Sequence, residues 1–484
     1  MKTNRAIFIN PGNPESIWNA ELTGAVATVT ATEIDRVLPC LREAEKLRES
    51  GYFVAGYIAY EAAPSLDPKM TTHPPSSLPL CHFTAFEKMR KPSPPFSKES
   101  GFAISKLQEE ISDDDYLARV LLVKDLISRG DVYQVNLTYR LRGRFEGSSL
   151  TLFSEILEKV DFPYCAFLDS QEWSILSFSP ELFFHVKGNR IKTSPMKGTA
   201  PRGATEEEDV KREKELSESL KNASENLMIV DLLRNDLGKI CLPGSVRVPS
   251  LFRVEKYRTL FQMVTDIVGE LSGRGSLEEI LRALFPCGSI TGTPKIRSME
   301  IIREVEKSPR GVYTGAIGLL MPTGESIFSV AIRTATVLKK ARLVEFGTGG
   351  GIVFDSSPAE ELEETKLKSL FFRSHDSSFS LLETVLYEKG KGFFLLEEHE
   401  KRMEEGATYF SFPFQKSEFR KSLEKAVTGL RWEKAVVRIL LDREGRFSWT
   451  VTPIKEEEIR PWTVRVIPAD FDPSSPFVLH KTTV

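Results

Sequence analysis

The pattern of apolar and polar positions in the first part of the chain predicts a mixture of helices and strands. Apolar residues at helical spacing predict a helix over 32–50, and the apolar run 54–59 predicts a buried strand. Ser112 followed by three aspartates is typical of a capped helix N-terminus, and that helix is expected to end at Gly130. The alternating residues 131–139 then predict a half-buried strand.

A predicted hairpin leads into a short loop in the middle of the chain. Residues 182–193 have the pattern of two strands joined by a Gly-Asn turn. Lys197 follows them in a loop bounded by Pro195 and Gly198. A desolvated lysine can lose its proton near neutral pH and act as a nucleophile, whereas most lysines are solvated surface residues. Lys197 is therefore a candidate nucleophile, with a solvated loop lysine as the alternative.

The long charged segment from 205 to about 235 predicts one helix with a single buried stripe. The apolar residues of this stripe are Leu216, Leu220, Ala223, Leu227, Val230 and Leu233. Glu225 lies beside the stripe, although most helical glutamates are solvated. Residues 231–238 place charged side chains between apolar ones up to a glycine. Such charges need a partner or a ligand wherever they are buried.

Three later stretches have features that suit anions. The Gly/Ser/Thr loop at 284–300 leads into a helix N-terminus without the P-loop pattern. Arg333 stands inside the apolar strand predicted at 328–337 and needs a carboxylate partner. The glycines at 349–351 let a ligand approach the backbone closely and offer N–H groups to an anion. A flexible linker would also be rich in glycine, but the flanking residues are typical of strands.

The helix predicted after Pro358 carries two carboxylates and a lysine on one face. These residues are Glu361, Glu364 and Lys368. Such a face is also typical of an ordinary salt-bridged surface. The polar residues 373–379 then predict a linker and a domain boundary.

Beyond the linker, the pattern predicts a separate small group of elements. The expected strands cover 381–387, 393–396, 435–441 and 447–451, and the last two form a hairpin. A helix is expected over 397–410, and it contains His399 and Arg402.

The composition limits the class of protein. The 484 residues carry a net charge of −3, with 41% hydrophobic and 27% charged residues, which suits two or three folded domains and excludes a disordered chain. Neither nucleic acid nor a membrane is expected as a partner. No apolar run is long enough to span a membrane, the N-terminus is not a convincing signal peptide, and the five scattered cysteines contain no CxxC pair. A reducing cytoplasm is the expected location, without a zinc site or a disulfide framework.

Seven motifs, taken in sequence order, resemble those of the chorismate-utilising enzymes. This family includes anthranilate synthase component I, aminodeoxychorismate synthase component I, and the isochorismate and salicylate synthases. The motifs are Ser179-Pro180-Glu181, Glu225 to Asp231, Arg234-Asn235-Asp236, Gly292-Thr293-Pro294-Lys295, Ile332-Arg333-Thr334, Gly349-Gly350-Gly351, and Glu361/Glu364/Lys368. The resemblance implies an α+β domain over residues 1–372, with two large, mostly antiparallel sheets packed as a sandwich and surrounded by helices.

The resemblance also implies how the substrate and a metal ion are held. Glu225 and Glu364, with Glu361 close by, are expected to bind Mg²⁺, a hard dication that prefers carboxylate oxygens and would clamp the ring carboxylate of chorismate. The residues expected to bind substrate are Lys368, Gly349, Gly350 and Gly351 at the ring carboxylate, Arg333 and Tyr313 at the enolpyruvyl carboxylate, and Thr293 and Gln134.

Two positions indicate a branch of the family. The aminodeoxychorismate synthases carry Pro-Ile-Lys-Gly-Thr where this chain has Pro195 to Thr199, and an alanine usually replaces the lysine in anthranilate synthases. Gln134 stands where isochorismate and salicylate synthases carry a water-activating lysine, so water is not the expected nucleophile. Gln262 occupies a position where many relatives have a histidine, which leaves the proton transfers there open.

The resemblance therefore implies a specific reaction. Lys197 is expected to attack ring C2 of chorismate, with Glu181 as general acid/base. Ammonia from a separate glutamine amidotransferase subunit would then give 4-amino-4-deoxychorismate for 4-aminobenzoate and folate synthesis. The alternatives are anthranilate synthase component I and a non-catalytic chorismate-binding subunit.

Residues 380–484 resemble the first half of 4-amino-4-deoxychorismate lyase, a fold-type IV pyridoxal-phosphate (PLP) enzyme. The resemblance implies that Arg402 binds the cofactor phosphate and that Lys481 is the Schiff-base lysine. The chain ends three residues after Lys481, before the second subdomain of that family. We therefore expect a small α+β half-domain with an incomplete PLP site and no lyase activity.

Overall fold

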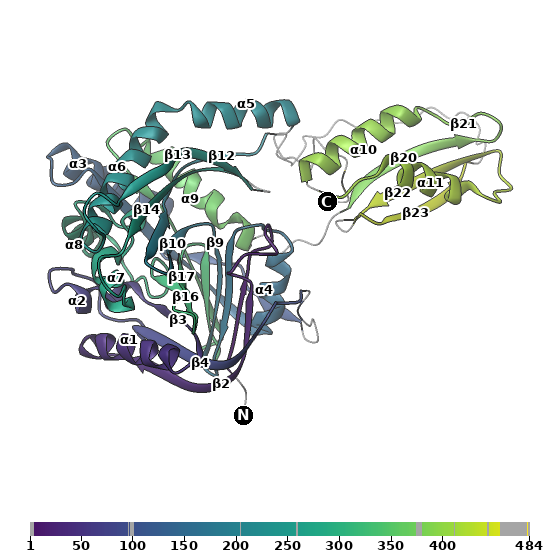
Figure 1. Ribbon diagram of the computed structural model, residues 1–484. Helices are drawn as coiled ribbons and strands as arrows, with labels where there is room; N and C mark the ends of the chain where they lie inside the picture. The colour runs from purple at the N-terminus through teal and green to yellow at the C-terminus, as the bar shows by residue number, and fades with distance from the viewer. Residues whose placement is uncertain are drawn as a thin grey trace. The chain divides into compact units, whose positions relative to one another are not determined.

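The computed structural model describes residues 4–94, 96, 101–203, 205–257, 260–373, 380–410, 412–442, 445–454 and 482. The chain forms two compact units (Figure 1). The first comprises Met1–Thr199, Leu216–Tyr257 and Gln262–His375, and the second comprises Ala200–Glu215, Arg258–Phe261 and Asp376–Val484. Apart from Arg373, the predicted linker lies outside the described residues.

Nineteen strands of the described residues belong to one sheet. They are β1 (Arg5–Ile9), β2 (Ala20–Ala31), β3 (Phe53–Ile58), β4 (Cys81–Arg90), β5 (Phe102–Ile104), β6 (Gln108–Glu109), β7 (Gln134–Gly147), β8 (Tyr164–Asp169), β9 (Trp173–Ser179), β10 (Leu182–Lys187), β11 (Arg190–Ser194), β12 (Met196–Pro201), β13 (Arg247–Lys256), β14 (Leu260–Glu270), β15 (Gly292–Thr293), β16 (Ala316–Leu320), β17 (Ser326–Val330), β18 (Thr334–Leu338) and β19 (Leu343–Ile352). Antiparallel pairings run without interruption through β14, β11, β10, β17, β16, β3, β4, β2, β1, β8, β9, β18, β19 and β7. The predicted α+β class with mostly antiparallel strands is confirmed.

The two faces of this sheet bury different hydrophobic cores. Alternate residues of a strand point to opposite faces, so on β3 Ala55 and Tyr57 enter one core while Val54 and Ile58 enter the other. The core containing Tyr57 is built only from strands and loops, and residues of β1, β8 and β9 meet those of β3, β16 and β17 there. The sheet therefore folds back on itself around this core. The second core lies between the sheet and the helices α1, α2, α6 and α7.

The helices of the first unit surround its sheet (Figure 1). They are α1 (Ile34–Glu49), α2 (Ala63–Leu66), α3 (Asp113–Ser128), α4 (Ser149–Leu157), α6 (Leu220–Gly238), α7 (Leu277–Leu284), α8 (Lys295–Val305) and α9 (Pro358–Arg373), with the 3-10 helices η1 (Tyr60–Ala62) and η2 (Gly288–Ile290). The helix α5 (Glu206–Ser217) lies mostly in the second unit. The predicted cap of α3 is present, because the Asp115 backbone N–H donates to Ser112 Oγ at 3.1 Å. None of the described helices is long and apolar enough to cross a membrane.

The prediction of one continuous helix from 205 to about 235 is wrong. The helix is interrupted before Ser219, whose extended backbone begins α6 and whose hydroxyl accepts a hydrogen bond from the Asn222 backbone N–H at 3.3 Å. A serine that caps a helix N-terminus competes with helix continuation, and apolar spacing does not reveal this competition.

The predicted buried stripe of this segment is also wrong in part. Leu220 and Leu227 are 85% and 49% exposed, whereas Asn226 is buried at 1%. Asn226 can occupy the buried face because its Oδ1 accepts a hydrogen bond from Thr265 Oγ1 of β14 at 2.7 Å. A long-range polar contact therefore rotated the helix away from the face that hydrophobicity favoured.

The C-terminal part of the second unit is a small α+β sheet domain. Its strands, in spatial order, are β21 (Gly392–Phe393), β20 (Leu381–Glu388), β22 (Lys434–Leu441) and β23 (Phe447–Pro453). The helices α10 (Leu396–Phe410) and α11 (Lys416–Val427) pack against this sheet over a core that includes Val385, Phe419 and Val437. The predicted helix, hairpin and first strand are present, but the strand expected over 393–396 is only Gly392–Phe393, because α10 begins at Leu396, and α11 was not predicted.

Candidate active site

A cavity of about 180 Å³ in the first unit brings together most of the residues singled out from the sequence. Those that line it are Glu181, Lys197, Glu225, Tyr313, Arg333, Gly349, Gly351, Glu361, Glu364 and Lys368. They come from β12, α6, β19, α9 and the loops that follow β9, α8 and β17. Polar residues that the sequence did not single out for this site, Asn136, Lys221, Asn222, Ser289 and Thr348, also line it. Segments more than 150 residues apart in sequence therefore form one polar site.

Lys197 and Glu181 face this cavity with shifted proton affinities. Burial lowers the pKa of the Lys197 amine, and the carboxylates of Glu225 and Glu181 oppose this shift. Burial raises the pKa of Glu181 to about 7, against the opposing effects of the Ser289 side chain, the Lys197 charge and the Met196 backbone. A lysine that loses its proton easily therefore lies beside a carboxyl group that holds one near neutral pH, which suits a nucleophile and a general acid.

Gln134 and Thr293, both expected to bind substrate, do not line the cavity, but Gln134 and Lys197 both lie close to Gly351. A Cβ atom on residue 351 would be 2.7 Å from Lys197 Nζ and 3.1 Å from Gln134 Nε2, so only glycine leaves room for both side chains. Gln134 is 0% exposed, and within the described part of the chain neither its amide oxygen nor its amide nitrogen has a hydrogen-bond partner. Thr293 pairs with Gln134 across β15 and β7, and its hydroxyl is likewise unpartnered. Buried polar groups without partners are rare and indicate a place for a ligand or water.

The carboxylates of α6 and α9 differ in their surroundings. Glu364 Oε1 lies 2.6 Å from Lys368 Nζ, and this ion pair holds the pKa of Glu364 below its usual range. Burial raises the pKa of Glu361 and of Glu225, and Glu364 repels both. Glu361 accepts a hydrogen bond from Ser356 Oγ at 2.7 Å. Mutually repelling, desolvated carboxylates in one cavity gain from a bound cation.

These carboxylates fit a hard divalent cation in donor type. Within the described ranges, however, no group of three or more His, Cys, Asp or Glu side chains is gathered closely enough to hold a metal ion. The lysine ammonium of Lys368 also donates to the Gly349 carbonyl at 3.0 Å. Gly350 does not line the cavity, but a Cβ there would lie 3.1 Å from Glu361 Oε2.

Arg333 and Tyr313 also line the cavity, where they provide a positive charge and a phenol hydroxyl. The Arg333 guanidinium lies 4.2 Å over the Phe162 ring, and burial lowers the pKa of this arginine to about 10. Among the residues the structure describes, no carboxylate forms an ion pair with Arg333. The Tyr313 ring packs on Gly347, where a Cβ atom would come within 2.3 Å of the ring. A buried cation without a protein carboxylate is suited to bind a carboxylate from a ligand.

Gln262 holds the strand that carries Lys197. Its Nε2 donates to the Gly198 carbonyl at 3.1 Å, and its Oε1 accepts a hydrogen bond from Thr199 Oγ1 at 3.2 Å. At the level of sequence, this position showed only that the histidine of many relatives is replaced, and no role was predicted for it. In the structure the side chain fixes the two residues that follow Lys197.

Arg402 lies in the second unit and is bound to a buried glutamate. Its Nε and Nη2 donate to Glu383 at 2.5 and 2.6 Å, and His399 Nδ1 lies 2.6 Å from the same carboxylate. A bidentate carboxylate uses the donors that a cofactor phosphate would need. Lys481, the expected Schiff-base lysine, lies outside the described residues.

Comparisons with known proteins cover both units. Residues 8–374 match the chorismate binding enzyme family, and residues 380–483 match amino-transferase class IV. The chain is 40% identical over 271 residues to anthranilate synthase component 1 of Saccharolobus solfataricus, covering 56% of this chain and 64% of that protein. It is 39% identical over 271 residues to aminodeoxychorismate synthase component 1 of Escherichia coli, covering 56% of this chain and 59% of that protein.

A solved structure shows the same fold. Anthranilate synthase component I of Streptococcus pneumoniae matches with a TM-score of 0.62 and 24% identity, covering 72% of this chain and 90% of that one. The chain spans about three-fifths of the length of the two curated relatives named above.

Proposed function

The chain belongs to the chorismate binding enzyme family, and on that basis we propose that it converts chorismate and ammonia to 4-amino-4-deoxychorismate. One observation carries this choice of reaction. A half-buried lysine, Lys197, lines the cavity together with Glu181, whose pKa burial raises to about 7. Relatives named for this reaction and for anthranilate synthesis match at similar identity, so the choice rests on Lys197 and its surroundings.

The charges of the cavity support chorismate as the substrate, because chorismate carries two carboxylates. Arg333, which has no carboxylate partner among the described residues, would bind the enolpyruvyl carboxylate together with the Tyr313 hydroxyl. Lys368 and the backbone of Gly349 and Gly351 would face the ring carboxylate. The substrate would thereby lie with its ring against Lys197.

Glu225, Glu361 and Glu364 would hold Mg²⁺ next to the ring carboxylate. The ion would neutralise charge on that carboxylate and act as a Lewis acid there. Burial raises the pKa of Glu361 and of Glu225, and a bound cation would oppose this shift because it favours the ionised carboxylates.

Lys197 would carry out the first covalent step. Its neutral amine forms a bond to ring C2, the ring double bonds shift, and the C4–O bond breaks. The departing hydroxyl takes the proton of Glu181 and leaves as water. The pKa of Glu181 near 7 makes its protonated form available at neutral pH.

Ammonia would complete the reaction at the same ring. It forms a bond to C4, the double bonds shift back, and the C2–N bond to Lys197 breaks. Lys197 leaves as a neutral amine with both of its N–H hydrogens, and the new C4 ammonium group passes one proton to the Glu181 carboxylate, so the net change is chorismate and ammonia to 4-amino-4-deoxychorismate and water. The enolpyruvyl group is retained. We propose a glutamine amidotransferase subunit as the source of ammonia.

A second candidate is anthranilate synthase component I. It is favoured by the 40% identity to the protein of that name from Saccharolobus solfataricus. That reaction releases pyruvate and does not need a lysine nucleophile, so it leaves Lys197 without a role.

The proposed function belongs to the first unit. In the second unit the Arg402 guanidinium is bound to Glu383, and this arrangement does not fit a phosphate at Arg402. We therefore assign no PLP-dependent step to the described part of that unit.

Product analysis tests the proposal directly. The purified chain is incubated with chorismate, Mg²⁺ and an ammonium salt, and the products are separated and quantified. We expect 4-amino-4-deoxychorismate with little pyruvate. Anthranilate with an equal amount of pyruvate would establish the second candidate, and binding of chorismate without either product would indicate a non-catalytic subunit.

A further inference from the structure

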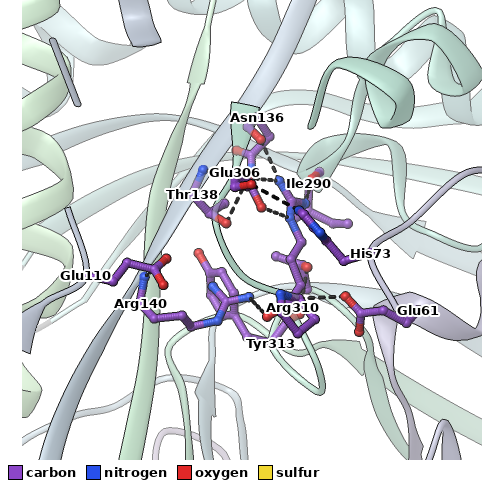
Figure 2. Close-up of polar contacts among 12 residues, drawn as sticks. Glu61, His73, Glu110, Asn136, Thr138, Arg140, Ile290, Glu306, Arg310 and Tyr313 are labelled. Atoms are coloured by element: carbon purple, nitrogen blue, oxygen red, sulfur yellow. Dashed lines mark hydrogen bonds and ion pairs between the residues drawn. The ribbon is translucent and has the colours of Figure 1, made fainter. Parts of the chain in front are cut away.

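Arg140 of β7 is a buried arginine close to Tyr313. It is 4% exposed, and its guanidinium lies 5.0 Å from the centre of the Tyr313 ring (Figure 2). Its Nη2 donates to the Pro309 carbonyl at 3.1 Å, and its backbone N–H donates to Glu110 Oε1 at 2.8 Å. Within the described ranges no carboxylate lies within ion-pair distance of its guanidinium. The guanidinium therefore contacts the Pro309 carbonyl and the Tyr313 ring, and its charge also opposes the rise in the pKa of Glu61 that burial causes.

Two neighbouring arginines differ from Arg140, because each of them forms ion pairs with carboxylates. Arg310 donates through Nε and Nη2 to both oxygens of Glu306, at 2.9 and 2.6 Å (Figure 2). Arg142, two residues along the same strand, pairs with Glu345 at 2.6 Å and with Glu110 at 3.2 Å. Both follow the rule that a buried or half-buried charge takes a carboxylate. Arg140 does not, although the Glu110 carboxylate accepts from its backbone.

The Tyr313 ring is held from two sides. The guanidinium of Arg140 lies over the ring, and the backbone of Gly347 packs so closely that a Cβ there would collide with the ring at 2.3 Å. Tyr313 and Gly347 line the cavity, whereas Arg140 does not. Arg140 can therefore affect a ligand only indirectly, either by holding Tyr313 or through the electrostatic field of its own guanidinium.

We propose that Arg140 is a positioning residue that fixes the Tyr313 ring against Gly347, so that the phenol hydroxyl meets the substrate's carboxylate. This inference rests on the proposed function, in which Tyr313 and Arg333 bind the enolpyruvyl carboxylate. Among the described residues no carboxylate forms an ion pair with Arg140, so its charge acts next to the ring, and a cation near the phenol also favours an anion at the hydroxyl end.

The test is a double-mutant cycle on chorismate binding and turnover. Arg140→Met is expected to raise KM for chorismate, and its dissociation constant in calorimetry without ammonium, by about fivefold, while kcat changes less than about twofold. Tyr313→Phe removes the hydroxyl and keeps the ring. In that background Arg140→Met is expected to weaken binding by less than about twofold, because no hydroxyl remains to be positioned.

Arg142→Met is the matched control, because it removes the same side chain from the same strand outside the cavity. It is expected to leave KM and the dissociation constant unchanged. If Arg140→Met does not fold, Arg140→Lys, which keeps the positive charge, takes its place in the cycle. This variant is expected to weaken chorismate binding by about twofold to threefold, and the effect should also disappear in the Tyr313→Phe background.

The outcomes separate this inference from the proposed function. If Tyr313→Phe weakens chorismate binding but the Arg140 variants do not, the positioning role is wrong and the substrate assignment stands. Equal weakening by Arg140→Met in both backgrounds, or a loss of kcat at unchanged KM, would also overturn the role. If Tyr313→Phe binds chorismate as tightly as the unmodified chain, the assignment of Tyr313 in the proposed function fails, and the inference fails with it.

Discussion

Two buried polar clusters of the first unit differ in how well their charges are satisfied. In the Arg310–Glu306 cluster, Arg310 donates to Glu306, to the Ile290 carbonyl at 2.8 Å and to the Asn136 carbonyl at 2.6 Å (Figure 2). Glu306 also accepts from the backbone N–H and the hydroxyl of Thr138 at 2.8 and 3.0 Å. Next to Lys197, by contrast, both polar atoms of the buried Gln134, which does not itself line the cavity, lack partners among the described residues.

The difference separates groups that hold the fold from groups that wait for a ligand. A buried charge with a full set of partners contributes rigidity and costs several kcal/mol if one partner is lost. A buried polar group without partners costs free energy in the folded state and indicates a place where a ligand or water can supply the missing bonds. Ile290 and Asn136, whose carbonyls accept hydrogen bonds from Arg310, also line the cavity. The Arg310–Glu306 cluster therefore supports the wall of this cavity.

The largest effect is expected from Lys197→Met. Removing the nucleophile should lower kcat at least about a thousandfold, and methionine keeps the volume of the side chain. Thermal stability should be unchanged or higher, because a desolvated amine is removed from a site where burial disfavours its charge. Product formation and thermal unfolding are measured on the same preparation. Near-normal turnover or strong destabilisation of Lys197→Met would contradict the view that the cavity residues serve the reaction and the Arg310–Glu306 cluster serves the fold.

The reverse pattern is expected from Arg310→Met in the satisfied cluster. The variant leaves the buried Glu306 without its cation and should lower the free energy of unfolding by about 3–5 kcal/mol, measured by urea denaturation. Arg297→Met on α8 is the control, since its ion pairs with Asp131 and Glu300 are partly exposed and should contribute less than about 1 kcal/mol. Equal losses in the two variants would mean that the cluster does not hold the wall of the cavity.

A smaller effect is expected on the metal site that we propose. Glu225→Ala should raise the Mg²⁺ concentration for half-maximal activity by about tenfold to a hundredfold and lower the maximal rate, since an oxygen ligand is lost. Glu363→Ala changes a glutamate with a 76% exposed side chain on α9 and should leave the Mg²⁺ dependence unchanged. If both variants kept the same Mg²⁺ dependence, Glu225 would not be a metal ligand.

The smallest effect is expected from Glu61, which accepts hydrogen bonds from the backbone N–H groups of Arg310 and Gly311 at 2.6 and 2.8 Å. Burial raises the pKa of Glu61 to about 7, so the folded state keeps this proton where the unfolded chain has lost it. The free energy of unfolding should therefore fall as pH rises from about 5 to about 7. Glu61→Gln removes this titration, so the fall should be shallower in urea denaturation measured across that range. A steeper or unchanged slope would contradict the assignment.

The sequence predicts the fold well where local signals dominate. The cap at Ser112, the helices α1 and α3 and the elements that follow Leu381 appear close to their expected bounds, because a capping side chain or a clear period determines each of them. The segment containing α5 and α6 failed for the opposite reason. Its buried face is set by the bond between Thr265 and Asn226, which are distant in sequence.

The site follows the same division. The motifs name most of the residues that line the cavity, because their types and order resemble those of a known family. Their surroundings could not be predicted. The contact of Arg140 with Tyr313, the bonds from Gln262 to the strand after Lys197 and the binding of Arg402 to Glu383 depend on packing between distant segments. No periodicity or spacing encodes such contacts.

The central claim is that Lys197 forms a covalent bond to the substrate, and intact-mass spectrometry tests it most directly. The chain is mixed with chorismate and Mg²⁺ without ammonium, quenched in acid, digested and mapped. The account predicts a species heavier by chorismate less one water, located on the peptide that contains Lys197, and absent from Lys197→Met. Rapid formation of 4-amino-4-deoxychorismate in the presence of ammonium by Lys197→Met, or an adduct on a different residue of the unmodified chain, would contradict it.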